Sequence, residues 1–320
     1  MAKGGLQSAL WVVGFAVATL VVIDVGLQRL TPLPPPLLEV TDGVGALGDG
    51  DPDVLAIGSS HTRSFAPLRD AIQPGQQMVL VPVEAGSFAS YEWVFAHRLR
   101  PLLKPRLRRV VFVTTFYDLC HKADHANLPG RAWTLGDFLV DVSARGLDDF
   151  NRNYLLRRMN RLFRPSVLVQ THGTDRILGD VKDRLRPAAV HEEKRLAALA
   201  RWREVIEGEY TRCDDSDEKA ALYRMIDDFQ ARHIEVVMAS FPLMPSSLSD
   251  KAKATTLKRY ADFLASLGRD RGVRIVDMTL TAPVADADFM DDFDHLTLPG
   301  NQRFSAWALE HDLSFLKAGP

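Results

Sequence analysis

Short apolar runs alternate with helical patterns along residues 52–320, and this alternation is the clearest structural signal in the chain. The runs are Val54–Ile57, Met78–Val83, Val110–Thr114, Ile234–Ala239 and Val273–Val276. Strands of a parallel sheet are buried on both faces, so they form continuous apolar runs instead of alternating ones. The pattern therefore predicts an α/β fold, a three-layer α/β/α sandwich around a mostly parallel five-stranded sheet.

A long polar stretch interrupts the alternation between the third and fourth runs. Residues 120–215 carry helical patterns and many charges, and they are too long for a loop, so we predict a helical insertion. Within it, apolar residues from Tyr154 to Phe163 fall on one helical face and arginines occupy the rest, up to Pro165. Such a helix either packs its apolar stripe on the core or lies against anionic lipid or a membrane partner.

The N-terminal segment has a different pattern, with no charged residue from Gly4 to Ile23. About 20 apolar residues are enough to cross a bilayer. We predict an uncleaved transmembrane helix within an anchor over 1–30, with Lys3 on the cytoplasmic side, and an extended proline-rich linker over 31–51. A cleaved signal peptide is the alternative, although no small-residue cleavage site follows the apolar run. The α/β domain over 52–320 would then lie on the periplasmic or extracellular side of the cytoplasmic membrane.

Composition narrows the classes of function. The chain has 320 residues, enough for a sizeable core, and its formal net charge of -2 gives no overall basis for binding nucleic acid. No glycine-rich phosphate loop follows any predicted strand. The two cysteines, Cys120 and Cys213, have neither zinc nor redox spacing. We interpret them as structural or free thiols, with one disulfide between them as the other option.

Candidate chemistry begins directly after the first predicted strand, at Gly58-Ser59-Ser60-His61. A serine at the turn from a strand into a helix lies beside backbone N–H groups that can stabilise an oxyanion. The same serines could instead simply cap the helix. A distant pair near the C-terminus, Asp292 and His295, favours the chemical interpretation.

Asp292 and His295 lie three positions apart, after the last predicted strand. This spacing lets the carboxylate hold the imidazole Nδ1 while Nε2 faces a serine hydroxyl, which is what a serine nucleophile requires. Asp294 is the adjacent candidate for the carboxylate, and Asp291 is a less favoured one. We therefore predict a catalytic triad of Ser60, Asp292 and His295.

A metal site is the other chemical interpretation of these residues. The chain has no Glu-x-x-His helix pattern, and His61, His121 and His125 have no obvious carboxylate cluster. We predict neither a metal nor a cofactor.

The serine motif, the Asp-x-x-His motif and the strands between them resemble the SGNH, or GDSL, hydrolase superfamily over about residues 52–318, apart from the insertion. In that family a serine follows strand one, a glycine follows strand two, and Asp-x-x-His lies near the end of the domain. These positions are matched here by Ser60, Gly86 and Asp292 with His295. The resemblance implies that the N–H groups of Ser60 and Gly86 form the oxyanion hole.

The third block of the family departs from its usual form in this chain. Most members carry Gly-x-Asn-Asp, and the asparagine donates to the oxyanion, whereas this chain has Thr115-Phe116-Tyr117-Asp118. The resemblance therefore places Tyr117 in the oxyanion hole, with a longer arm than asparagine. Loss of one oxyanion donor can cost about 100-fold in rate.

Several features together are similar to one branch of the superfamily, the membrane-tethered acyl-transfer proteins of the cell envelope, such as the D-alanyl transfer protein of teichoic acid modification and the alginate O-acetylation proteins. These features are the Gly-Ser-Ser block, the anchor, the insertion, Phe241–Pro245 and His295–Gly300. Members of the branch commonly work beside a membrane-bound O-acyltransferase.

This second resemblance implies that Ser60 accepts a small acyl group, such as acetyl, and passes it to a hydroxyl of a cell-envelope or extracellular polysaccharide. An esterase or deacetylase, which passes the group to water, is the alternative. A non-catalytic, membrane-tethered scaffold with a degenerate fold is the second alternative, and Tyr117 favours it.

Overall fold

The computed structural model describes residues 35–72, 77–83, 86–120, 188–209 and 215–317, together with a few isolated positions. The chain divides into two compact units, one of Met1–Leu38 with Leu128–Leu185 and one of Glu39–Asn127 with Arg186–Pro320. Nearly all the described residues belong to the second unit, which contains the β-sheet.

Five parallel strands form one sheet in the order β2-β1-β3-β4-β5. They are β1 (Val54–Gly58), β2 (Met78–Pro82), β3 (Arg109–Thr114), β4 (Glu235–Ser240) and β5 (Arg274–Asp277). The predicted α/β class and five-stranded parallel sheet are confirmed. Every residue of β1 is buried, and so is nearly all of β3 and β4, which is why these strands appear in the sequence as uninterrupted apolar runs.

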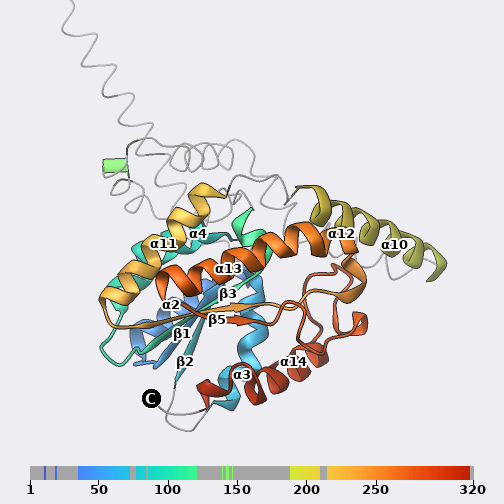
Figure 1. Ribbon diagram of the computed structural model, residues 1–320. Helices are drawn as coiled ribbons and strands as arrows, with labels where there is room; N and C mark the ends of the chain where they lie inside the picture. Colours follow the sequence, from blue (N-terminus) through green and yellow to red (C-terminus); the bar gives the residue numbers. More distant parts are fainter. Residues whose placement is uncertain are drawn as a thin grey trace, which may run out of the picture. The chain divides into compact units, whose positions relative to one another are not determined.

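Helices cover both faces of the sheet (Figure 1). They are α3 (Ala66–Ala71) and α14 (Leu298–Glu310) on one face, and α4 (Phe88–Val94), α11 (Ser216–Ala231) and α13 (Lys258–Arg271) on the other. On the first face, Val113 and Phe304 share one buried apolar cluster. On the second, the ring of Phe112 lies edge-on to Phe229 of α11, and Thr114 shares a 2.7 Å hydrogen bond with Tyr260 of α13.

The remaining elements complete the described fold. They are α2 (Pro35–Asp49), α10 (Ala188–Glu204), α12 (Asp250–Ala252), the 3-10 helices η1 (Ser60–Phe65), η3 (Arg100–Leu102), η4 (Phe116–Leu119), η6 (Pro245–Ser247), η8 (Asp286–Asp288) and η9 (Ser314–Leu316), and the π-helical turns η2 (Phe95–Leu99), η5 (Val205–Glu209) and η7 (Lys253–Leu257).

The extended linker predicted over 31–51 is wrong for Pro35–Asp49, which form α2. The prolines of this helix occupy its first turn, where a missing N–H removes no helical hydrogen bond. Val40, Gly43 and Leu47 form its buried face. A Cβ on Gly43 would lie 2.4 Å from the carbonyl oxygen of Leu80, so only glycine lets α2 approach edge strand β2 this closely. The compact unit therefore starts at Glu39 instead of at residue 52.

Two other sequence predictions fall largely outside the described residues. Only Trp11 and Thr19 of the predicted anchor are described. Among the helices of the described residues, none combines the length and apolar character needed to cross a bilayer. Within the predicted insertion at 120–215, α10 and η5 confirm helical structure at its C-terminal end, whereas the arginine-rich segment ending at Pro165 lies outside the described residues.

The strand order places a topological switch point between β1 and β3. The connection that leaves β1 runs to β2 on one side, and the connection that leaves β3 runs to β4 on the other side. The two connections therefore diverge at the carboxyl ends of β1 and β3. Open parallel sheets bind their ligands in the crevice that forms there. The fold therefore favours the segments that follow Gly58 and Thr114 as the place for a site.

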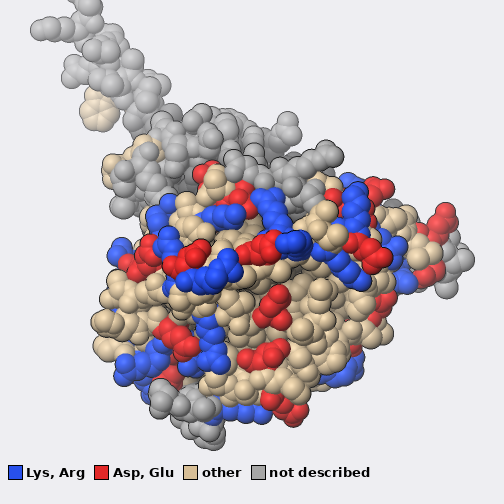
Figure 2. Space-filling view, viewed as in Figure 1, with Lys and Arg blue, Asp and Glu red and all other residues tan. Residues whose placement is uncertain are grey.

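Figure 2 shows Lys and Arg side chains interspersed with Asp and Glu over the described part of the face that carries α11 and α13. Many form ion pairs, for example Arg271 with Asp227 (2.5 Å) and Lys258 with Asp262 (2.6 Å). Exposed pairs of this kind contribute little to stability. Their mixture of signs gives the described part of this face no extended basic patch of the kind that binds nucleic acid.

Gly58 is required by packing, and this requirement is testable. A Cβ at this position would lie 2.1 Å from the backbone oxygen of Val113, so β1 and β3 would have to separate. We expect Gly58→Ala to lower the free energy of unfolding by about 2–4 kcal/mol in chemical denaturation.

Gly45→Ala is the matched control for this prediction. Gly45 lies on the exposed face of α2, and a Cβ there meets nothing within 4 Å, so we expect alanine to raise stability by about 0.5–1 kcal/mol. Equal effects of the two substitutions would contradict the packing argument.

Candidate active site

Ser60 is the first residue of η1 and follows β1 after a single intervening residue, Ser59. The turn is closed by the N–H of Thr62, which donates to the carbonyl of Ser59 at 3.0 Å. The side chain of Ser60 lies at the carboxyl end of β1, where the switch point predicts a site, and the residue is only 5% exposed.

His295 lies in a short loop whose ends are held together. An antiparallel bridge joins Phe289 to Leu296, and the N–H of Met290 donates to the carbonyl of His295 at 2.7 Å. At the tip, Phe293 has a φ of 63°, a left-handed conformation that a bulky residue rarely adopts. Its ring is buried in the core cluster, which offsets the conformational cost.

The start of α14 fixes the other end of this loop. Thr297 caps the helix by accepting from the N–H of Gly300 at 3.1 Å, and Pro299 occupies the first turn. Farther along α14, the hydroxyl of Ser305 donates to the carbonyl of Ser64 in η1 at 2.9 Å. The helix that follows His295 is thus attached to the helix that begins with Ser60.

The three residues predicted as a catalytic triad form a continuous hydrogen-bonded chain. Nε2 of His295 lies 2.6 Å from Oγ of Ser60, and Nδ1 lies 2.9 Å from Oδ2 of Asp292. Because a carboxylate only accepts hydrogen bonds, Nδ1 carries the imidazole proton and Nε2 accepts from the serine hydroxyl. The geometry meets the requirement for a serine whose proton is removed by histidine.

Asp292 is held in its ionised form. Partial burial raises its pKa, but the His295 side chain and the N–H groups of His295 and Asp294 all donate to this carboxylate and lower the pKa to about 2. Asp292 therefore keeps a full negative charge at neutral pH beside the imidazole whose orientation it fixes.

The other two predicted oxyanion donors have acceptors of their own. The N–H of Gly86 donates to the carbonyl of Val83 at 2.9 Å, and the hydroxyl of Tyr117 donates to Oδ1 of Asp294 at 2.5 Å. The third predicted donor, the N–H of Ser60, belongs to the same residue as the predicted nucleophile. The arrangement gives Tyr117 a different neighbour from the one that the family resemblance implies.

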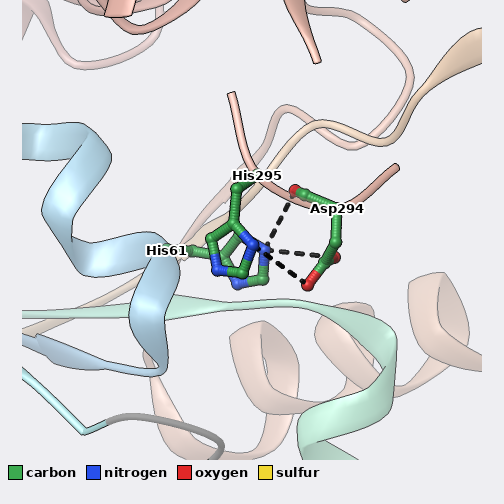
Figure 3. A group of neighbouring side chains, drawn as sticks. All are labelled: His61, Asp294 and His295. Atoms are coloured by element: carbon green, nitrogen blue, oxygen red, sulfur yellow. Dashed lines mark hydrogen bonds and ion pairs between the residues drawn. The ribbon is translucent and has the colours of Figure 1, made fainter. Parts of the chain in front are cut away.

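A second histidine lies against the first (Figure 3). The ring of His61 is stacked on that of His295, with centroids 5.0 Å apart and planes 10° from parallel. Its Nε2 is 3.2 Å from both Oδ1 and the backbone oxygen of Asp294, and its Nδ1 is 2.8 Å from Oγ of Ser59. The two adjacent serines are thus bonded to different histidines, and Ser60 is the one bonded to His295.

His61 has no obvious carboxylate cluster in the sequence, but the fold brings Asp294 to it from the far end of the chain. One signal was present in the sequence: Asp294 is the acid adjacent to His295 and was already a candidate carboxylate. Its pairing with His61 could not be known before the loop was placed against η1.

His61, Asp294 and His295 are close enough to be considered as metal ligands, since one donor atom of each lies within 4.8 Å of the others. The stacked rings oppose this interpretation. Imidazole lone pairs lie in the ring plane, and one ion needs two such planes to converge, whereas these are nearly parallel. Both nitrogens of His295 are also engaged, with Ser60 and Asp292.

A buried polar network supports the segments around Gly86 and Tyr117. The hydroxyl of Tyr91 lies 3.2 Å from the carbonyl of Gly86 and 3.1 Å from Oδ1 of Asp118, and Oδ2 of Asp118 accepts from the N–H of Thr115 at 2.8 Å. Burial raises the pKa of Asp118 well above its usual value. Tyr91 therefore links the segment after β2 to the segment after β3.

Glu218 holds the start of α4 in the same region. Its carboxylate accepts from the hydroxyl of Ser87 at 2.9 Å and from the N–H of Ala89 at 2.8 Å, although it belongs to α11. Burial raises its pKa to about 7 despite these two hydrogen bonds. Sequence reasoning did not single out Glu218, because nothing in the helical pattern of α11 marks one glutamate as buried.

Cys120 follows η4 directly and is disulfide-bonded. The other cysteine of the chain, Cys213, lies outside the described residues. Of the two options left open by the sequence for Cys120, the disulfide is the one observed. The disulfide therefore lies at the end of the segment that carries Tyr117.

Comparison with known proteins identifies no relative of this chain, so its class of protein must be inferred from the fold and the site. No protein-family model matches the chain, and a search of curated proteins finds no match. The fold and the site together describe a parallel α/β domain with a Ser-His-Asp chain at the carboxyl edge of its sheet.

The raised pKa of Glu218 predicts a pH-dependent contribution to stability. Because the folded state holds this proton up to about pH 7 and a free carboxyl only to about 4.5, the folded protein binds more protons between these values. The free energy of unfolding should therefore fall as the pH rises through this window. We expect the stability advantage of the wild type over Glu218→Gln to shrink by at most ~3 kcal/mol between pH 5 and 8 in chemical denaturation.

Glu193→Gln provides the comparison, because Glu193 is an exposed glutamate of α10. Its difference from the wild type should stay constant over the same range. A constant difference for Glu218→Gln as well would show that Glu218 does not titrate in this window.

Proposed function

We propose that this protein is a serine-dependent acyl-transfer enzyme in which Ser60 carries the acyl group. The observation that supports this most strongly is the chain of two short hydrogen bonds, from Ser60 to His295 at 2.6 Å and from His295 to Asp292 at 2.9 Å. Capping a helix requires neither the histidine nor the aspartate. A hydroxyl, an imidazole and a carboxylate in this order are the parts of an activated serine nucleophile.

In the proposed reaction, Oγ of Ser60 attacks the carbonyl carbon of an acyl donor while its proton passes to Nε2 of His295. The tetrahedral intermediate collapses, the donor's leaving group takes that proton from His295, and an ester forms on Ser60. His295 then removes the proton of an acceptor hydroxyl, which attacks the ester. The acyl group leaves on the acceptor, and Ser60 regains its proton. Asp292 stabilises the imidazolium in both halves of the reaction.

We assign the acceptor by resemblance, as a hydroxyl of a cell-envelope or extracellular polysaccharide, and the donor group as acetyl or another small acyl group. The SGNH-like motifs, the apolar segment from Gly4 to Ile23 and the insertion support membership of the membrane-tethered branch. On this proposal the chain is anchored by one helix in the cytoplasmic membrane, its α/β domain lies outside, and a membrane-bound O-acyltransferase supplies the acyl group. The disulfide at Cys120 supports this location, because disulfides persist in oxidising compartments.

Two other functions predict different results. An esterase or deacetylase would use the same residues and the same acyl-Ser60 ester, but it would pass the group to water. A non-catalytic scaffold would have an unreactive serine. The intact Ser60–His295–Asp292 chain favours the two enzymes over the scaffold.

Covalent labelling tests the proposal without knowledge of the natural substrate. A fluorophosphonate reacts with a serine only when a base activates it, so we expect the full-length protein to be modified once, at Ser60, by peptide mass spectrometry. Ser60→Ala should abolish the labelling, and His295→Ala should slow it at least ~1,000-fold. Ser314→Ala, at an exposed serine far along the chain, is the matched control and should label at the wild-type rate.

The outcome also separates the candidate functions. Absence of labelling in the wild type would support the scaffold and contradict our proposal. If Ser60 is labelled, an acetyl-ester donor supplied with and without a polysaccharide acceptor distinguishes transfer to the polymer from release of acetate.

A further inference from the structure

Asp294 is held by contacts from two elements that are distant from its own loop. Its Oδ1 accepts from the hydroxyl of Tyr117 in η4 at 2.5 Å, and it lies 3.2 Å from Nε2 of His61 in η1. The backbone oxygen of Asp294 lies 3.2 Å from the same nitrogen. Burial raises the pKa of Asp294, but His61, Tyr117 and His295 together lower it below its ordinary value. Asp294 is therefore a fixed negative charge.

The other oxygen of this carboxylate faces the proposed catalytic base. Oδ2 of Asp294 lies 3.9 Å from Nδ1 of His295, on the side of the ring where Asp292 accepts the hydrogen bond at 2.9 Å. At 3.9 Å Asp294 forms an ion pair with the imidazolium instead of a hydrogen bond. An opposite charge within about 4–6 Å favours the protonated form of histidine. Two carboxylates thus act on one imidazole, one through a hydrogen bond and one through its charge.

His61 has an assigned proton position as well. Its Nε2 lies 2.9 Å from the hydroxyl oxygen of Tyr117 and 3.2 Å from the carboxylate and carbonyl oxygens of Asp294. The oxygens of Asp294 only accept, and Tyr117 donates its own proton to Asp294, so Nε2 carries the proton and Nδ1 accepts from the hydroxyl of Ser59. The ring is packed between His295 at 5.0 Å and Phe241 at 4.3 Å, and it is 1% exposed. His61 is consequently too buried to meet a substrate, and it contacts the site through Asp294, the hydroxyl of Tyr117 and the face of His295.

Tyr117 has a single hydroxyl proton, which Asp294 accepts, and the Tyr117 oxygen also lies 2.9 Å from Nε2 of His61. A proton donated to a carboxylate is not available to an oxyanion in the same arrangement. Burial, followed by the neighbouring charges of Asp294 and Asp118, raises the pKa of Tyr117 well above its ordinary value, so the hydroxyl remains a donor. In the family that this chain resembles, this position holds an asparagine that donates to the oxyanion. Here it holds Tyr117, which donates to the carboxylate of Asp294.

We propose that Asp294 is a second carboxylate partner of His295, and that Tyr117 and His61 are positioning residues that hold it in place. This inference rests on the proposed roles of Ser60 and His295. Tyr117 then supports the reaction through Asp294 and His295, and not as an oxyanion donor.

The sign of the effect follows from the charges around His295. The groups that face it are Asp292 and Asp294 from its own loop, His61 and Ser60 from η1, and Tyr117 from η4 beside Asp294. Removing the charge of Asp294 leaves the imidazolium less stabilised, so the pKa of His295 should fall. Because the neutral imidazole activates Ser60, the acidic limb of the pH–rate profile should move to lower pH.

The experiment is the pH dependence of the fluorophosphonate labelling rate of Ser60. We expect Asp294→Asn to move the midpoint of the acidic limb down by about 0.5–1 pH unit relative to the wild type. Asp291→Asn is the matched control, because it removes the same charge from an exposed position in the same loop, and its midpoint should not move. An unmoved midpoint in Asp294→Asn would overturn the proposal.

Tyr117→Phe distinguishes a positioning residue from an oxyanion donor. We expect Tyr117→Phe to shift the midpoint in the same direction as Asp294→Asn, and to change the rate less than about 2-fold when Asp294 is already asparagine. A loss of about 100-fold at every pH, equal in both backgrounds and without a midpoint shift, is the signature of an oxyanion donor and would contradict us.

Titration of the His295 ring by NMR separates this proposal from the proposed function. It reads the pKa of His295 in Asp294→Asn and Asp291→Asn without any reaction at Ser60. A lower pKa in Asp294→Asn alone supports the second carboxylate even if Ser60 proves unreactive, whereas equal values in the two variants overturn it even if Ser60 is labelled.

Discussion

The candidate site depends on one hydrogen bond that joins residues 235 positions apart, the bond between Ser60 and His295. Ser60 follows β1, but the segment that carries His295 follows β5, and β3 and β4 separate these two strands in the sheet. Three strand spacings amount to roughly 14 Å, which a short connection does not cross. The segment 278–297 is long enough to cross it, and α14 completes the return by packing on α3 and η1.

Much of this arrangement could be predicted because the underlying physics is local or periodic. Strands such as β1 and β3 are buried on both faces, so their residues are uniformly apolar and their ends could be located closely. The proximity of Ser60, Asp292 and His295 was predictable for a different reason. A triad needs particular residue types at the carboxyl ends of strands, and those positions are visible once the strands are known.

The supporting residues could not be predicted, because their roles come from tertiary contacts between distant segments. His61 has no acid near it in the sequence, and Asp294 becomes its partner only when the last loop crosses the sheet. Tyr117 could be matched to a family position, but the direction of its hydroxyl depends on where Asp294 lies. The proline content favoured an extended linker where α2 forms. A proline is tolerated in the first turn of a helix, and the prolines of α2 lie only there, which composition alone does not reveal.

Gly58 and Asp292 report on different properties of the protein. Gly58 has no room for a side chain against Val113, so a descendant that lost all chemistry would still need glycine there to close its sheet. Asp292 has a side chain that is 49% exposed, and its hydrogen bonds serve only its own short loop and His295. In a comparison among relatives, Gly58 would therefore trace descent of the fold, and Asp292 would trace survival of the proposed reaction.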